Sequence, residues 1–237
     1  AWNPVTQKQA WKQPVDSFWN GGTLATAGNL VFQGTASGMF HGYEATTGAR
    51  VWSFNVGQGV LAAPMTYAIN GVQYVSLLAG YGGATSAGGK LMQEGWKYNA
   101  QPRRLLTFSL NGEASLPPTA PPDFTVKALD DPSLELAEKD IEAGRQLYVN
   151  NFCIVCHGRD LGTGGTAPDL RESAIALTLE GLWSVVHDGA LLQKGMPQFD
   201  NITKQQAGQL HAYIRAGARE SLGTRQSSDK ESSFGRF

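Results

Sequence analysis

The chain has 237 residues, a net charge of −1 and only 16% charged residues, with 19 lysines and arginines against 20 acidic residues. This balance excludes the basic surface that nucleic-acid binding requires. No apolar run approaches the roughly twenty residues of a membrane span, so the sequence predicts no transmembrane helix. No signal peptide is visible at the first residues, as expected if the N-terminus of a longer polypeptide is absent.

The first part of the chain, residues 1–112, is predicted to be a β-domain. It holds five of the six tryptophans and many Gly-Gly steps. Short β-prone runs bounded by turn residues predict strands at Leu30–Gln33, Arg50–Val56, Gln73–Leu78 and Leu105–Leu110. No helical period of useful length interrupts these runs.

An internal repeat indicates how these strands are arranged. The segment Trp2–Trp11 aligns with Tyr43–Trp52: each begins with an aromatic residue and ends with tryptophan, at an offset of 41 residues. A period near forty residues, built from short strands and turns, is typical of a β-propeller blade. Two copies leave a second interpretation open, in which the segments are unrelated hairpins.

A proline-rich segment separates this domain from the rest of the chain. It contains Pro117-Pro118-Thr119-Ala120-Pro121-Pro122, a composition that favours a semi-rigid linker. The expected organisation is a β-domain at 1–112, a linker at 113–123, a second domain at 124–219 and a C-terminal tail at 220–237. Because the tail is rich in serine, glycine and charge, we expect it to be flexible or draped over the surface.

The second domain is predicted to be small and all-α. Apolar residues at helical spacing predict a first helix at Leu136–Asn150 and a second at Glu180–His187. A third helix is predicted at Thr203–Ala216, where Thr203 and Gln206 have the spacing of a capping box.

One five-residue motif, Cys153-Ile154-Val155-Cys156-His157, holds both cysteines of the chain. Two thiols separated by two residues, with a histidine directly after the second, form the arrangement that attaches a c-type haem. Cys153 and Cys156 would bond the two vinyl groups of the porphyrin, and His157 would ligate the iron on the proximal side. A redox disulfide lacks the βαβ context of a thioredoxin-like protein, and a zinc site would need two further ligands. The motif therefore predicts one covalently bound haem c.

A second axial ligand is expected from the distal side of the haem. Met196 lies in Gly195-Met196-Pro197, 39 residues after His157, on a loop that follows the second helix. A thioether sulfur is a soft ligand that favours ferrous iron and raises the reduction potential. The alternatives are a packing role for Met196 and ligation by His187 or His211, each of which falls in a predicted helix.

This pattern of helices and ligands resembles class I cytochrome c domains. Gly144 and Tyr148, one turn apart on the first helix, would let that helix cross the last one closely. In the family a proline-containing loop lies on the proximal side of the haem, and Ala167–Leu170 is the matching segment here. The resemblance implies that the carbonyl of Pro168 accepts a hydrogen bond from His157 and fixes its ring.

The β-domain also carries a family resemblance. Gly42–Trp52 resembles the tryptophan-docking motif of dehydrogenases that use pyrroloquinoline quinone (PQQ), and Phe18–Leu24, Leu30–Thr35 and Ala79–Gly83 resemble further segments of that family. With the haem domain included, residues 1 to about 218 are similar to the C-terminal part of a quinohaemoprotein alcohol dehydrogenase.

The resemblance implies that the β-domain holds two to three of the family's eight propeller blades, so the remaining N-terminal blades are partners of this chain. The calcium ligands and the catalytic aspartate base would belong to those earlier blades, and no catalytic residue is assigned here. Trp19, Tyr81 and Gly82 are the candidates for the wall of a PQQ or substrate cavity, although a tryptophan in a propeller more often packs between blades. Glu44 and Asn3 stand where the docking repeat usually has aspartate, and Tyr81 where tryptophan is commoner.

The expected fold class is mainly β, with blades of a PQQ-type propeller followed by an all-α class I cytochrome c domain. The resemblance implies oxidation of an alcohol to an aldehyde at PQQ, with Ca²⁺ bound nearby, and electron transfer through haem c to an external acceptor. That acceptor would be a soluble copper protein or a cytochrome subunit, and the family implies a periplasmic location. Two alternatives remain: a stand-alone cytochrome subunit whose β-domain docks it to a partner, and a propeller-type interaction module whose haem senses redox state or gas.

Overall fold

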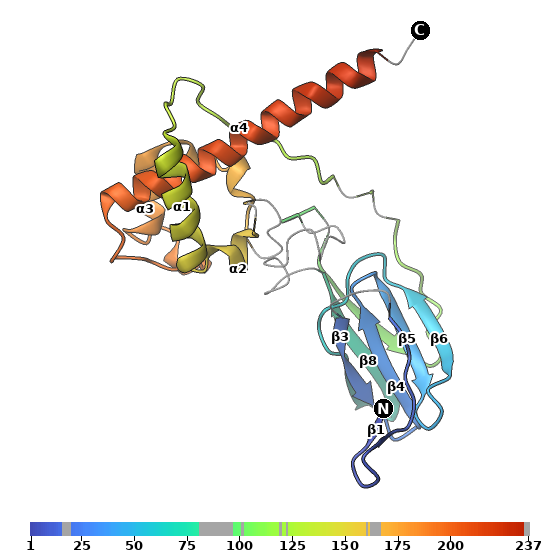
Figure 1. Cartoon of the computed structure of the whole chain (residues 1–237). Helices are drawn as coiled ribbons and strands as arrows, with labels where there is room; N and C mark the ends of the chain where they lie inside the picture. The colour runs from blue at the N-terminus through green and yellow to red at the C-terminus, as the bar shows by residue number, and fades with distance from the viewer. Residues whose placement is uncertain are drawn as a thin grey trace. The chain divides into compact units, whose positions relative to one another are not determined.

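The computed structural model of the chain (Figure 1) describes residues 1–15, 20–80, 97–100, 102–118, 120–121, 123–159, 161 and 167–234, with side chains described as far as residue 223. The chain forms two compact units that divide between Asp123 and Phe124, the residue at which the second domain is expected to begin. The first unit is built of β-strands and the second of helices, the fold class that the sequence predicts. No helix in the described ranges is long and apolar enough to cross a membrane.

The described part of the β-unit contains three antiparallel sheets whose strands follow chain order. The strands are β1 Trp2–Asn3, β2 Lys8–Gln9, β3 Asn20–Ala25, β4 Leu30–Thr35, β5 Met39–Glu44, β6 Arg50–Asn55, β7 Met65–Ile69, β8 Val72–Ala79 and β9 Arg104–Ser109. Strands β1 and β2 form a hairpin, β3 to β6 a four-stranded sheet, and β7 to β9 a three-stranded sheet. Because four antiparallel strands make up a propeller blade, the β3–β6 sheet corresponds to one blade.

The β3–β6 and β7–β9 sheets share an apolar core. Its buried members are Phe40, Val56, Val60, Val75, Leu77 and Ala79. The rings of Phe40 and Trp52 approach that of Phe108 on the other sheet, with centroid distances of 5.5 and 5.4 Å. Because successive side chains alternate between the faces of a strand, Met39 and His41 lie on the opposite face from Phe40.

The tryptophan-docking contact implied by the repeat is present. The Nε1–H of Trp11 donates to the carbonyl oxygen of Ala45 at 2.8 Å. Gly48 has a φ of +75°, and a Cβ at this position would lie 2.5 Å from the Trp11 ring, so only glycine fits there. Since Trp11 ends the first repeat and Gly48 lies in the second, this contact joins two successive blades.

The two residues that replace aspartate in the docking repeat still act as turn acceptors. The side-chain oxygen of Asn3 accepts hydrogen bonds from the backbone N–H groups of Val5 and Thr6, at 2.9 and 3.0 Å. In the second repeat, the Glu44 carboxylate accepts from both the hydroxyl and the backbone N–H of Thr47. These hydrogen bonds lower the pKa of Glu44 to about 2. Neither replacement therefore opens its turn.

The outward face of the β7–β9 sheet exposes several large apolar side chains. Met65, Ile69, Leu78 and Leu105 are between 51% and 65% exposed, and Leu78 and Leu105 are cross-strand partners. Ser76 and Thr107, 2.8 Å apart, lie among them on the same face. Exposed apolar side chains gathered on one face indicate an interaction surface.

The helical unit consists of α1 Glu138–Asn150, α2 Cys153–His157, α3 Leu179–Val186 and α4 Lys204–Phe234, with single 3-10 turns η2 Leu170–Glu172, η3 Ile175–Leu177 and η4 Leu192–Lys194. The three predicted helices are found as α1, α3 and the first part of α4. The predicted capping box at the start of α4 is also present. The backbone N–H of Gln206 donates to Thr203 Oγ1 at 3.3 Å, and the backbone N–H of Thr203 donates to Gln206 Oε1 at 2.9 Å.

The predicted close crossing of α1 and α4 is confirmed (Figure 1). Gly144 leaves no space for a side chain, because a Cβ there would lie 1.9 Å from the carbonyl oxygen of Gln209 on α4. Tyr148 is buried one turn later, with its ring centroid 5.4 Å from that of Tyr213. The Tyr148 hydroxyl donates to the carbonyl of Gly158 at 2.6 Å, which ties the crossing to the end of α2.

The C-terminal tail differs from the expectation. Helix α4 does not end near Ala216 but continues to Phe234, so residues 220–234 are helical (Figure 1). No proline follows Pro197 in the sequence, and several tail residues are good helix formers, among them Arg219, Glu220, Leu222, Gln226 and Lys230. These residues therefore extend α4, although the serines and the glycine of the tail have lower helix propensity and led to the expectation of a flexible tail.

Candidate haem-binding site

The haem motif forms its own single turn of helix. Phe152 has a φ of +57°, and this left-handed residue redirects the chain from the end of α1 into α2. Within α2, Cys153 precedes Cys156 by three residues and His157 by four, so the three side chains lie on one helix face. A single turn thus presents both thiols and the imidazole together.

Both cysteines are free thiols in this structure, which does not support the disulfide alternative. Cys156 is exposed, whereas Cys153 is half-buried and packs against the apolar core of the helical unit. Burial raises the pKa of the Cys153 thiol to about 11, so at neutral pH this residue is the protonated thiol.

The imidazole of His157 is oriented from its Nδ1 side. The residue is buried, and Nδ1 lies 2.9 Å from the carbonyl oxygen of Pro168, the contact that the cytochrome resemblance implies. A carbonyl can only accept, so Nδ1 carries the hydrogen and Nε2 keeps its lone pair. Burial lowers the pKa of His157. The residue is therefore a neutral imidazole, the form that binds metal.

The loop that carries Pro168 is held by its neighbours. The Leu170 N–H donates to Leu161 at 3.2 Å, and the Asp169 carboxylate is paired with Arg171 at 2.7 Å. Arg215 reaches this loop from α4 and donates to the carbonyl of Leu170 at 2.8 Å. Sequence reasoning missed Arg215, although a charged residue directly after Ile214 on the apolar face of a helix is a signal that could have indicated it.

The structure brings Met196 to the same core as the haem motif. Gly195 has a φ of +89° and turns the chain after η4, so that the half-buried side chain of Met196 packs against the cluster that Cys153 and Ile154 also contact. This position suits an axial ligand on the distal side. Ligation of the iron by Met196 stays a prediction.

The two competing histidines are engaged elsewhere. The ring of His187 stacks on Trp183 with a centroid distance of 3.9 Å, and its Nδ1 pairs with the Asp188 carboxylate at 2.8 Å. His211 is buried on α4, where its Nε2 lies 3.2 Å from the carbonyl of Leu177. Packing and surface roles therefore account for both residues.

These residues fit a covalently attached haem c. The two thiols, a neutral histidine with a free Nε2 and a nearby methionine make up the donor set of such a centre. Cys153 and Cys156 would hold the group, His157 and Met196 would ligate its iron, and Pro168 would fix the His157 ring. When bound, the haem supplies a centre that accepts and releases one electron at a time.

The residues proposed for a PQQ or substrate cavity, Trp19, Tyr81 and Gly82, all lie outside the described residues. The preceding residue, Gly80, is described: its N–H donates to the carbonyl of Gly59 at 2.8 Å, which ties the end of β8 to the loop after β6. Within the described ranges, no group of three or more His, Cys, Asp or Glu side chains is arranged to hold a metal ion.

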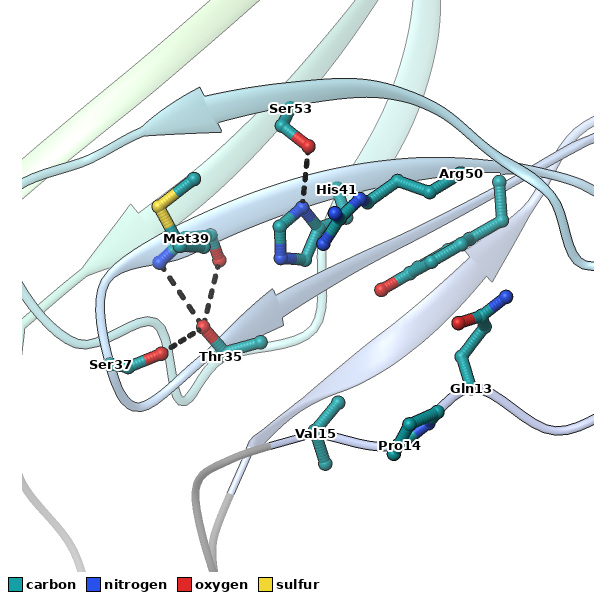
Figure 2. A pocket seen from close by; sticks show the side chains of 10 residues that line it. Gln13, Pro14, Val15, Thr35, Ser37, Met39, His41, Arg50 and Ser53 are labelled. Atoms are coloured by element: carbon teal, nitrogen blue, oxygen red, sulfur yellow. Dashed lines mark hydrogen bonds between the residues drawn. The ribbon is translucent and has the colours of Figure 1, made fainter.

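A polar cavity of ≈ 330 Å³, which the sequence does not predict, opens on the β-unit (Figure 2). It lies between residues 13–15 and the face of β4–β6 that points away from the β7–β9 sheet. Inside it, Nδ1 of His41 and the Ser53 hydroxyl are 2.8 Å apart, and burial lowers the pKa of His41. Because Trp11 and its neighbours reach over this face from the preceding repeat, the cavity marks a junction between blades.

Comparisons with known proteins agree with both halves of this description. Residues 2–75 match the family model for the β-propeller domain of glucose, ethanol and alcohol dehydrogenases, labelled PQQ. Residues 139–214 match the model described as cytochrome c oxidase, cbb3-type, subunit III.

Whole-chain relatives contain both domains. The chain is 47% identical over 216 residues to quinohaemoprotein alcohol dehydrogenase ADH IIB of Pseudomonas putida, covering 90% of this chain and 31% of that protein. Among solved structures, the P. putida enzyme ADHIIG superposes with a TM-score of 0.73 at 39% identity, covering 94% of this chain and 32% of that one. The Comamonas testosteroni quinohaemoprotein alcohol dehydrogenase gives a TM-score of 0.66 at 36% identity, covering 92% and 31%. The chain thus spans about a third of the length of these relatives.

Propeller blades followed in one polypeptide by a cytochrome c domain define a quinohaemoprotein. The site holds the residues that would ligate a haem, and the β-unit contains the blade contacts of this class. More specifically, the chain is similar over both of its domains to quinohaemoprotein alcohol dehydrogenases, of whose length it spans about a third.

Proposed function

We propose that this chain is the C-terminal part of a PQQ-dependent alcohol dehydrogenase that oxidises an alcohol to an aldehyde and passes the electrons through haem c to an external acceptor. The observation that carries the proposal is the haem site. The helix α2 donor set and the Pro168 contact of His157 follow, in one chain, blades that match the PQQ propeller family.

PQQ and the haem would have different roles because they accept different numbers of electrons. Oxidation of an alcohol to an aldehyde releases two electrons and two protons, whereas a single haem iron accepts one electron at a time. PQQ, when bound in the completed propeller, supplies the two-electron acceptor. In this chain, His157 and Met196 would hold the iron, and the two thioethers would keep the group fixed in place between successive one-electron transfers.

The β-unit would complete its propeller with the remaining N-terminal blades. Two faces support this proposal: the outer face of β7–β9, which exposes Met65 and Leu105, and the β4–β6 face that residues 13–15 border. Leaving such faces and strand edges in water would promote aggregation. The calcium ligands, the catalytic base and most of the PQQ contacts would come from those blades.

The surroundings of the protein are also part of the proposal. The acceptor would be a soluble copper protein or a cytochrome subunit, and the location would be the periplasm, where a covalent haem is attached in bacteria. Trp19, Tyr81 and Gly82 would contribute to the wall of the cofactor or substrate cavity.

The test is stopped-flow reduction of the full-length protein by alcohol, with the quinone and haem bands followed separately. Replacing both Cys153 and Cys156 with serine removes the haem tether and leaves the β-unit unchanged. Alcohol should still reduce PQQ in a single turnover, while steady turnover with a protein acceptor should collapse.

A variant at Trp19 or Tyr81 serves as the complementary control, because it should change substrate preference or PQQ retention and leave the haem spectrum intact. If the double serine variant delivers electrons to its protein acceptor at the parent rate, the haem is not on the path and the proposal fails.

A further inference from the structure

The helical unit contains a buried cation that the haem site described above does not use. Arg215 on α4 is 0% exposed. Its Nη1 donates to the carbonyl of Leu129 at 2.6 Å and its Nη2 to that of Leu170 at 2.8 Å. Its Nε is buried and has no hydrogen-bond partner in the described part of the chain.

No carboxylate in the described part of the chain is hydrogen-bonded to Arg215, although the nearby charge of Asp130 partly offsets it. Both of its acceptors are neutral backbone carbonyls. The acidic residues next to them are already paired: Asp169 with Arg171 at 2.7 Å, and Asp130 with Arg219 at 2.7 Å. Burial lowers the pKa of Arg215, but a guanidinium stays protonated at neutral pH. Since a buried charge that no carboxylate pairs directly is unfavourable, the retention of Arg215 calls for a functional reason.

The position of this charge connects it to the iron ligand. Leu170 lies two residues after Pro168, whose carbonyl holds His157. The path from the guanidinium to the His157 ring consists of the hydrogen bond to Leu170, two residues of chain and the hydrogen bond at Pro168. Its greatest possible length is roughly 15 Å. Arg215 also joins the loop to the segment before α1, where the Leu129 N–H donates to the carbonyl of Arg171 at 2.9 Å.

We infer that Arg215 is a positioning residue that holds the proximal loop and, through its buried charge, raises the midpoint potential of the bound haem. Reduction of ferric to ferrous iron adds one electron and lowers the positive charge of the centre by one. A fixed cation nearby repels the ferric state more than the ferrous state, so it favours uptake of the electron. The inference rests on haem attachment in the proposed function and is independent of alcohol oxidation.

The test is a spectroelectrochemical titration of the haem band in the full-length protein without alcohol. Arg215→Met keeps most of the buried volume and removes the charge. At an electrode potential where the parent is half reduced, the ratio of ferrous to ferric haem should fall by on the order of fivefold, the effect of a unit charge at this range in a protein interior. Arg215→Lys restores the charge without the two-pronged hydrogen bonding, and it should recover most of that loss.

Arg219→Met is the matched control, because it removes the same charge one turn later on α4. Its side chain is 40% exposed and paired with Asp130, so its loss should lower the ratio by clearly less than the loss of Arg215. A parent-like ratio in Arg215→Met, or an equal fall in Arg219→Met, overturns the inference.

If Arg215→Met does not fold, a variant that is expected to raise the ferrous fraction still tests the inference. Asp130→Asn removes the nearby negative charge that partly offsets Arg215. The ferrous fraction at the same potential should then rise, and an unchanged or lower fraction contradicts the electrostatic role. Because no alcohol is present in either experiment, failure here is distinguishable from failure of the proposed enzyme activity.

Discussion

Replacing Gly144 with alanine tests the helix crossing that frames the haem site. The added Cβ would lie 1.9 Å from the carbonyl oxygen of Gln209, 2.6 Å from its carbonyl carbon and 2.9 Å from Cβ of Tyr213. Two of these atoms are backbone, so no side-chain rotation relieves the overlap, and α1 and α4 must move apart by about 1 Å or more. Overpacking of this kind lowers the free energy of unfolding by about 1–3 kcal/mol. Replacing a glycine with alanine in a helix interior raises it by up to about 1 kcal/mol. We expect a net loss of about 1 kcal/mol in the free energy of unfolding.

The assay is urea unfolding of the intact protein followed by haem absorbance, which reports on the helical unit alone. Gly208→Ala is the matched control on α4, because no atom lies within 4 Å of its added Cβ. This variant should be stabilised by up to about 1 kcal/mol through helix propensity. If Gly144→Ala is as stable as the parent, or if both variants shift alike, the close crossing is not a source of stability and the reasoning is refuted.

Three further predictions concern the ligand, the β-unit and pH. Replacing Met196 with alanine should abolish the weak thioether-to-iron absorption near the red end of the visible spectrum and lower the potential; an unchanged spectrum would return the ligand role to His187 or His211. Residues 1–112 expressed alone should not form a soluble monomer, because their apolar outer faces would be left in water; cooperative unfolding of such a monomer contradicts the propeller interpretation. Burial lowers the pKa of His211 from 6.5, so the unfolded chain binds this proton more readily than the folded chain. The contribution of neutral His211 is therefore complete above about pH 6.5 and is lost as the pH falls below it. His211→Gln should flatten that part of the curve of urea midpoint against pH, and a curve that keeps its slope would exclude this residue as the cause.

The parts of the fold that sequence reasoning identified are those with local signals. Strands β4, β6, β8 and β9 consist of β-prone runs bounded by turns, and they were predicted. Strands β3, β5 and β7 were missed. β3 contains Gly21-Gly22 and β5 contains Gly42, which lower β-propensity, and their pairing is decided by neighbouring strands.

In the candidate site, too, sequence reasoning identified only the residues that carry a local signal or a family resemblance. The spacing of Cys153, Cys156 and His157 within one helical turn is sufficient to identify the haem motif, and the family resemblance identified Pro168. The local sequence marks Arg215 only as a charge next to Ile214. Its hydrogen-bond partners, the carbonyls of Leu129 and Leu170, are far away in sequence, so no local pattern reveals its role. Such contacts are decided by the tertiary packing of α4 against the proximal loop and the segment before α1.

The contact between Gly144 and Gln209 closes a loop of about 65 residues, and both predicted iron ligands, His157 and Met196, lie inside that loop. Closing a flexible loop of this length costs on the order of 4 kcal/mol of chain entropy, and the cost grows only slowly with length. Once α1 and α4 have met, His157 and Met196 search a confined volume for their common centre, which raises the effective concentration of each ligand. An intact crossing would therefore hold Met196, the predicted weak ligand, on the iron more firmly than the sulfur–iron bond alone allows.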